Sequence, residues 1–200
     1  VSKEDDIQRV IQDTESNVGP IDLFCSNAGV GMGESINSPN KEWQMSWDIN
    51  VMSHVYAARH LLPLMTARGG GYFLNTSSAA GLLNQIGGAA YGVTKHAAVG
   101  FGEWLAIHHK HEGIKVSMLC PQAVRTAMTD NDNDATAAAA SNGMIEPEEL
   151  CETVVEGLRS ESFMILPHPI VLEYMRNKTS SYDRWIGGMN KLMRKITGQN

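Results

Sequence analysis

The sequence predicts an α/β fold, in which helices cover both faces of a doubly wound parallel sheet. Helical and strand-like segments alternate along the chain with short connections, which is the pattern of parallel sheets. Asn27, Ser78 and Pro121 fall at or just past the ends of three strand-like runs. Ligands bind such sheets outside the carboxyl ends of the strands. We therefore expect a functional site at that edge of the sheet.

The N-terminal segment is expected to form a helix that Ser2 caps and that Gly19-Pro20 ends. Its apolar stripe consists of Ile7, Val10 and Ile11. A short buried strand over residues 21–25 follows. Asn27, Ala28 and Gly29 then form a tight turn, whose small residues allow a ligand or a neighbouring strand to approach closely.

The middle of the chain predicts two longer helices and two strands. Residues 41–67 read as a helix that Pro63 should bend, because proline removes a backbone donor. A strand ends at Ser78, and a glycine-rich connection leads to a helix that bears Tyr91 and Lys95 and runs to about Lys110. Gly113 stops that helix, and a strand over residues 115–120 follows it.

The C-terminal third predicts a lid, a helix, a strand and a helical tail. Residues 126–146 are polar and alanine-rich, which favours a mobile lid. Asp130, Asp132 and Asp134 alternate like calcium ligands, but the glycine and closing glutamate of an EF-hand are missing, so no metal is expected. A helix over 147–159 and a strand over 163–166 precede a tail at 170–200. The tail's amphipathic helix should pack on the body or on a second subunit, with a membrane surface as the alternative.

Tyr91 and Lys95 stand four residues apart, one turn along the same helix face. A tyrosine phenol titrates near pH ~10 when free. An ammonium ~4 Å away favours the phenolate by roughly 4 kcal/mol at an effective dielectric of ~20, or about 3 pKa units. We therefore expect a lowered phenol pKa that suits general acid-base catalysis near neutral pH.

Several segments resemble the short-chain dehydrogenase/reductase family, in the family's order and at its spacings. They begin at Ser26-Asn27-Ala28-Gly29 and Asn50-Val51. They continue with Asn75-Thr76-Ser77-Ser78-Ala79-Ala80-Gly81, Tyr91-Gly92-Val93-Thr94-Lys95 and Pro121-Gln122-Ala123-Val124-Arg125-Thr126. The resemblance covers about residues 1–130. It implies a single Rossmann-like domain over residues 1–200, and an oxidoreductase that moves hydride between NAD or NADP and an alcohol or ketone.

The resemblance also implies a role for each matching residue. Tyr91 would be the general acid or base, Lys95 would lower its pKa and bind the nicotinamide ribose, and Ser78 would stabilise the oxyanion. Asn50 would hold, through its backbone, a water that links Lys95 to solvent. Ser77 is the alternative to Ser78, since adjacent strand residues face opposite ways; the spacing of thirteen to Tyr91 favours Ser78.

Cofactor contacts are implied on both sides of this group. Asn27, Ala28 and Gly29 would line the adenosine side, and Pro121, Val124 and Thr126 would contact the nicotinamide carboxamide, together with Tyr91 and Lys95. Gln122 stands where the family usually has glycine, which puts the local backbone in question.

The family's TGxxxGxG turn and first strands are absent from this sequence. We therefore expect a truncated piece of a longer enzyme, with impaired dinucleotide binding and an exposed apolar edge on the strand at 21–25. The choice between NAD and NADP would depend on residues that are also absent.

The composition limits the classes of partner and the cellular location that we expect for this protein. A formal charge of −6 argues against nucleic acid, and no apolar run reaches the ~20 residues of a membrane span. Cys25 and Cys120 lie in apolar runs and Cys151 makes an odd number, which favours reduced core thiols and a cytoplasmic protein. The resemblance implies a homodimer or homotetramer acting on a small molecule.

Two other functions remain open on the sequence. A non-catalytic binding or scaffold protein could retain this fold. A sugar-nucleotide epimerase shares the Tyr-x-x-x-Lys pair, although the region after Thr126 leaves little room for the larger substrate domain of such enzymes.

Overall fold

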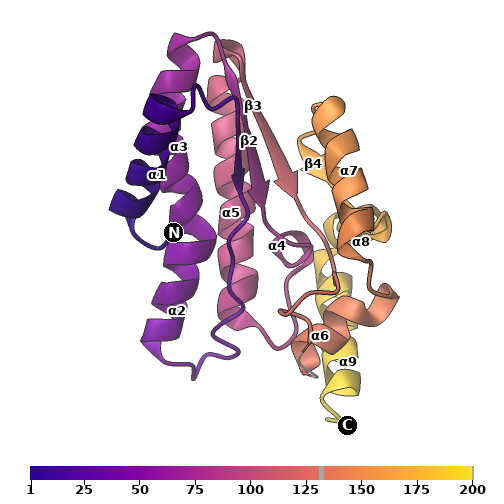
Figure 1. Cartoon of the computed structure of the whole chain (residues 1–200). Helices are drawn as coiled ribbons and strands as arrows, with labels where there is room; N and C mark the ends of the chain where they lie inside the picture. The colour runs from indigo at the N-terminus through magenta and orange to yellow at the C-terminus, as the bar shows by residue number, and fades with distance from the viewer. Residues whose placement is uncertain (131–132, 200) are drawn as a thin grey trace.

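The sheet contains four parallel strands in the order β1-β2-β3-β4 in the computed structural model, which describes residues 1–130 and 133–199. The strands are β1 (Leu23–Ser26), β2 (Gly71–Thr76), β3 (Ile114–Leu119) and β4 (Met164–Ile165) (Figure 1). In register, Phe24 pairs with Phe73, which in turn pairs with Val116. The predicted α/β class with a parallel sheet is confirmed.

Helices cover both faces of the sheet (Figure 1). The main core lies under α1 (Glu4–Asn17), α3 (Ser53–Ala67) and α5 (Ala89–His109) and contains large buried side chains such as Ile11, Leu61 and Phe73. On the opposite face, α7 (Pro147–Arg159) packs on Leu74, Leu119 and Ile165. The two clusters therefore hold the sheet between layers, as the alternating pattern predicts.

Several predicted boundaries need correction. Ser2 does not cap α1: Lys3 is the N-cap residue and makes no side-chain cap bond, while the first turn is acidic, which suits the helix dipole. The helix predicted over 41–67 is divided into α2 (Asn40–Trp47), a π-helical turn η1 (Asp48–Met52) and α3. The glycine-rich connection contains a short helix that the sequence analysis missed, α4 (Ala80–Leu83).

The end of α5 follows the prediction closely. A short 3-10 turn, η2 (Lys110–Glu112), leads to Gly113, whose φ of 80° is left-handed. Glycine adopts this conformation without steric penalty, so the chain can turn sharply into β3.

The C-terminal third contains more helix than the sequence pattern indicated. Within the segment 126–146 lie α6 (Asp134–Ala139) and η3 (Ala140–Asn142), and the tail forms α8 (Ile170–Ser180) and α9 (Tyr182–Ile196). The lid prediction falls partly on residues 131 and 132, which lie outside the described residues. Trp185 of α9 lies 6.2 Å from the Tyr174 ring of α8, and both side chains pack against the main core, so the amphipathic tail helix packs on the body.

β1 forms an open edge of the sheet, in agreement with the expected exposed strand. Leu23 is 41% exposed, and a shallow hollow lined by residues of α1 and β1 runs along the amino-terminal end of the strand. Cys25 is exposed on this strand rather than buried in the core as predicted, because it shares the exposed face of β1 with Leu23, whereas Phe24 on the other face packs against the core. Cys120 is fully buried.

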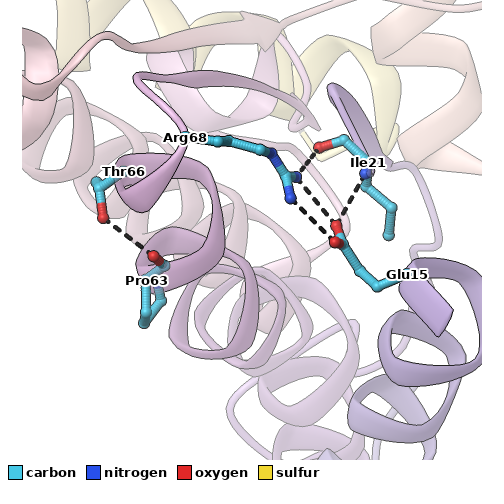
Figure 2. Close-up of polar contacts among 5 residues, drawn as sticks. All are labelled: Glu15, Ile21, Pro63, Thr66 and Arg68. Atoms are coloured by element: carbon cyan, nitrogen blue, oxygen red, sulfur yellow. Dashed lines mark hydrogen bonds and ion pairs between the residues drawn. The ribbon is translucent and has the colours of Figure 1, made fainter. Parts of the chain in front are cut away.

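An ion pair fixes the connection from α1 into β1 (Figure 2). The Arg68 guanidinium, just past α3, donates to both carboxylate oxygens of Glu15 at 2.9 and 3.0 Å, and to the Ile21 carbonyl at 2.6 Å. Glu15 also accepts from the Ile21 N–H at 2.8 Å. A bidentate pair of this kind sets direction as well as distance, so α1 and β1 are held in register with the end of α3.

Candidate active site

The carboxyl ends of the strands bring three separate stretches of the chain together. Thr76, the last residue of β2, donates from its hydroxyl to Asn27 Oδ1, just past β1, at 3.0 Å. Ser78 Oγ donates to the Pro121 carbonyl, just past β3, at 3.3 Å. Because the strands are parallel, the residues that follow them meet at one edge, as the sequence predicted.

Tyr91 and Lys95 lie in the first two turns of α5 and face this edge. The Lys95 Nζ lies 5.6 Å from the centre of the Tyr91 ring and donates to the Thr76 carbonyl at 3.1 Å. Lys95 is 2% exposed, whereas Tyr91 is partly exposed. The ammonium is thus held inside the protein, and Tyr91 is the more accessible residue of the pair.

The pKa values at this pair differ from the sequence expectation. Burial raises the pKa of the Tyr91 phenol, and the adjacent Ser78 hydroxyl opposes that rise in part. Burial also lowers the pKa of Lys95 to about 8. The expected lowering of the phenol pKa is therefore wrong for this structure, because the penalty for burying a phenolate is larger than the stabilisation that the Ser78 hydroxyl gives it.

Ser77 and Ser78 have different partners. Ser77 is buried and its hydroxyl donates to the Lys95 carbonyl at 2.9 Å, so it ties α5 to the end of β2. The Ser78 hydroxyl accepts from the Ala80 N–H at 3.1 Å and lies beside the Tyr91 phenol. This arrangement favours Ser78 over Ser77 as the hydroxyl available to a substrate.

Asn50 occupies the π-helical turn between α2 and α3 and is fully buried. Its carboxamide accepts from the Val30 N–H and donates to the Val30 carbonyl, both at 2.9 Å, and it also donates to Thr94 Oγ1 at 3.0 Å. Asn50 therefore ties the loop after β1 to the helix that carries Lys95. Turns of this kind inside α-helices are frequent at functional sites.

The turn after β1 packs directly on the same group. A Cβ atom on Gly29 would stand 3.1 Å from Lys95 Nζ and 3.3 Å from Asn50 Oδ1, so a larger side chain would press on both. Asn27 and Ala28 are exposed beside it. The three residues predicted to line the adenosine side thus lie at the site, with two of them open to a ligand.

The segment after β3 is fixed to the C-terminal part of the chain. Val124 pairs with Ile145 as an isolated bridge, and the Thr126 N–H donates to Thr129 Oγ1 at 3.1 Å. The Gln122 N–H donates to His168 Nδ1 at 3.2 Å, and its side-chain oxygen accepts from Asn142 at 3.4 Å. The bond to His168 uses the backbone and would be open to glycine as well, whereas the contact to Asn142 needs the glutamine side chain.

Two glycines that the sequence did not point to also pack against the residues of the site. A Cβ atom on Gly81 would lie 2.5 Å from the Lys95 carbonyl oxygen and 2.6 Å from Ser77 Oγ. Gly33, at a φ of 77°, lies against Ala90, whose N–H donates to the Gly33 carbonyl at 2.9 Å. Gly81 is the last residue of a segment that matches the family, so the sequence could have indicated its role. The role of Gly33 depends on a contact between segments far apart in the chain, which the sequence pattern does not reveal.

The described part of the chain bears on two further possibilities, a metal site and a membrane-spanning helix. No group of three or more histidine, cysteine, aspartate or glutamate side chains is arranged to hold a metal ion there, and Asp132 of the aspartate alternation lies outside it. Among the helices that the structure describes, none combines the length and apolarity that crossing a bilayer requires.

Comparisons with known proteins agree on one family. A family model described as short chain dehydrogenase matches residues 1–137. Epidermal retinol dehydrogenase 2 of Homo sapiens is 30% identical over 178 residues, which cover 87% of this chain and 57% of that protein. The chain thus spans little more than half of this relative. A short chain dehydrogenase/reductase from Burkholderia phymatum, solved in complex with NAD, has a TM-score of 0.80 and 25% identity and matches 91% of this chain and 73% of its own.

Proposed function

Because the chain belongs to the short-chain dehydrogenase/reductase family, we propose that the protein transfers hydride between a nicotinamide cofactor and an alcohol or ketone. The family uses NAD(P), and a solved relative holds NAD. The observation that carries the proposal is the convergence of Ser78, Tyr91 and Lys95 from β2 and α5 at the carboxyl edge of the sheet. This group supplies the donors and the acid-base residue that such a reaction needs.

The proposed roles follow from the contacts. Tyr91 holds its proton on the phenol because burial raises its pKa, so in ketone reduction it can donate that proton to the substrate oxygen. Ser78 lies beside the phenol and can donate to the same oxygen as negative charge develops on it. Asn50 holds the surrounding loop and α5 in place through its buried carboxamide.

The residues present fit the nicotinamide half of the cofactor, whose chemistry is to give or accept a hydride. Lys95 Nζ uses one of its three N–H donors on Thr76 among the described residues, which leaves donors for ribose hydroxyls. Gly29 is free of a Cβ atom that would press on Nζ. We assign the adenosine side to Asn27, Ala28 and Gly29, and the carboxamide contacts to Pro121, Val124 and Thr126.

The test uses the full-length protein and follows absorbance of reduced nicotinamide with NADH and NADPH against a panel of ketones and alcohols. Turnover that disappears in Tyr91→Phe, while cofactor affinity is retained, is the expected result. Cofactor binding without turnover across the panel would favour a non-catalytic scaffold, and failure to bind either cofactor would contradict the proposal altogether.

A subunit contact and a cytoplasmic location belong to the same proposal. Large apolar side chains are exposed along α2, α3 and α5: Trp47, Leu64, Val93, Trp104 and Ile107, the last at 75%. Exposed apolar surface of this kind favours association, and we propose a homodimer or homotetramer through this face. Light scattering on the full-length protein, compared with Ile107→Asp, tests it; a monomeric wild type would contradict it. The three free thiols suit a reducing compartment.

A further inference from the structure

The short helix α4 directly follows Ser78, and hydrogen bonds hold both of its ends. At its start, the Ala80 N–H donates to Ser78 Oγ at 3.1 Å. Near its end, the Leu82 carbonyl accepts from the Lys178 ammonium at 2.6 Å. The last carbonyls of a helix have no partner within that helix, and a lysine side chain is one of the groups that can bond them. Lys178 belongs to α8, so the C-terminal part of the chain holds the end of α4.

Lys178 has a second partner on α5. Its Nζ lies 3.4 Å from His96 Nε2, and His96 Nδ1 lies 2.8 Å from the Gly92 carbonyl oxygen. Because a carbonyl oxygen can only accept, Nδ1 carries the ring proton and Nε2 keeps the lone pair that accepts from the ammonium. A doubly protonated ring would instead turn an N–H toward the ammonium. Lys178 therefore connects three helices: α8, α4 and α5.

The Lys178 ammonium is partly enclosed by these contacts. The side chain is half-buried, and burial lowers the pKa of Lys178. Its Nζ also lies 5.7 Å from the centre of the Tyr182 ring, within the range of a cation–π contact. Hydrogen bonds from a charged donor that is shielded from water are stronger than those of a surface lysine. The connection between the three helices is therefore a firm one.

α4 links two members of the catalytic group. Ser78 precedes it, and Asn84, the residue that ends it, packs on the first turn of α5. A Cβ atom on Gly92, next to Tyr91, would lie 2.4 Å from Asn84 Oδ1. A movement of the end of α4 relative to α5 would therefore change how Ser78 lies relative to Tyr91.

We propose that Lys178 is a positioning residue for the catalytic group: it anchors the end of α4 on α5 and thereby holds Ser78 beside Tyr91. The anchoring can be measured without turnover, whereas its effect on the reaction rests on the function proposed above. Lys178 lies beyond residues 1–137, which match the family model, so this support comes from the C-terminal part of the chain.

The primary test measures amide hydrogen exchange in the full-length protein and compares Lys178→Met with the wild type. The Leu83 and Asn84 amides donate to carbonyls at the start of α4. Losing the hydrogen bond from the charged donor should speed their exchange by about 10- to 100-fold. Exchange in α7, which packs on the opposite face of the sheet, is the internal reference and should stay unchanged.

Arg176→Met is the matched control, because it removes a positive charge from an exposed position on the same helix. It should leave exchange in α4 unchanged. Unchanged exchange in Lys178→Met, or an equal acceleration in Arg176→Met or in α7, would overturn the proposal.

Two further variants test the connection to α5. His96→Phe removes the acceptor on α5 and leaves the Leu82 carbonyl, so it should speed exchange in α4 less than Lys178→Met does. Combined with Lys178→Met it should add little, since both changes break one contact; fully additive effects would overturn the connection. Lys178→Arg keeps the charge and the donors and should return exchange toward the wild-type rate.

Kinetics of an active full-length enzyme test the positioning itself. Lys178→Met should lower kcat by up to about 10²-fold, the effect of a misplacement of about 1 Å, while KM for the nicotinamide cofactor stays constant. Lys178→Arg should restore kcat. Faster exchange with an unchanged kcat would overturn the positioning role. A wild type without turnover would contradict the proposed function, and the exchange measurements would still decide whether Lys178 anchors α4.

Discussion

The catalytic group and the segment after β3 face the same edge of the sheet, but different interactions hold them. Ser77 and Lys95 are buried and fixed on backbone carbonyls, at 2.9 and 3.1 Å. The segment after β3 has a backbone bridge between Val124 and Ile145, and its side-chain contacts are exposed. Arg125 and Glu146 form an ion pair there although their side chains are 61% and 55% exposed. A rigid site beside an adjustable loop is the common division between chemistry and substrate selection.

The largest expected effect is the loss of turnover in Tyr91→Phe, measured in the full-length protein. Removing the phenolic proton should lower kcat by about 10²–10⁴-fold, the usual contribution of general acid-base catalysis. In the segment after β3, Asn142→Ala breaks the contacts to Gln122 and Tyr174. This variant should change KM more than kcat. Steady-state kinetics on both variants checks this, and an active Tyr91→Phe enzyme would remove Tyr91 from the mechanism.

The rigidity of the catalytic group is tested next by Gly81→Ala. A methyl group there would collide with the Lys95 carbonyl and Ser77 Oγ, so we expect a loss of about 1–3 kcal/mol of unfolding free energy. Gly100→Ala is the matched control on α5, since its Cβ would meet nothing within 4 Å, and it should stabilise by about 0.5–1 kcal/mol. Denaturant unfolding distinguishes them; equal effects would mean that the Lys95 backbone is not tightly packed.

The variant Lys95→Met measures how much the buried ammonium lowers the free energy of unfolding. The pKa of Lys95 is lowered to about 8, so between pH 8 and the unfolded value of 10.5 the unfolded chain binds more protons. The unfolding free energy that depends on this residue therefore rises with pH across that window. Below pH 8 it is about 3 kcal/mol lower than above pH 10.5.

We accordingly expect Lys95→Met to be more stable than the wild type at pH 7, with an advantage that shrinks as the pH rises above 8. Measured unfolding free energies of the two proteins at several pH values decide the matter. A less stable variant at pH 7 would show that the bond to the Thr76 carbonyl outweighs the cost of burial.

The same comparison explains what the sequence could predict. The alternating pattern and the spacing from Ser78 to Tyr91 and Lys95 depend on local periodicity, and both the sheet and the placement of these side chains follow from it. Gly33 acts through a contact with Ala90, which lies far along the chain, and periodicity does not report such contacts. The predicted direction of the Tyr91 pKa shift was wrong because the shift depends on burial. Spacing in the sequence indicates a nearby charge but does not report desolvation.

The smallest effect should come from Arg125→Gln. The Arg125 Nε donates to Glu146 at 2.8 Å, but both side chains are mostly in solvent, where such pairs are screened by water and salt. The melting temperature should therefore change less than in Gly100→Ala, and its small shift should vanish in high salt. Thermal melts at low and high ionic strength test this. A large, salt-resistant loss would show that the loop after β3 is held as firmly as the catalytic group, because the bridge between Val124 and Ile145 would then depend on the ion pair beside it.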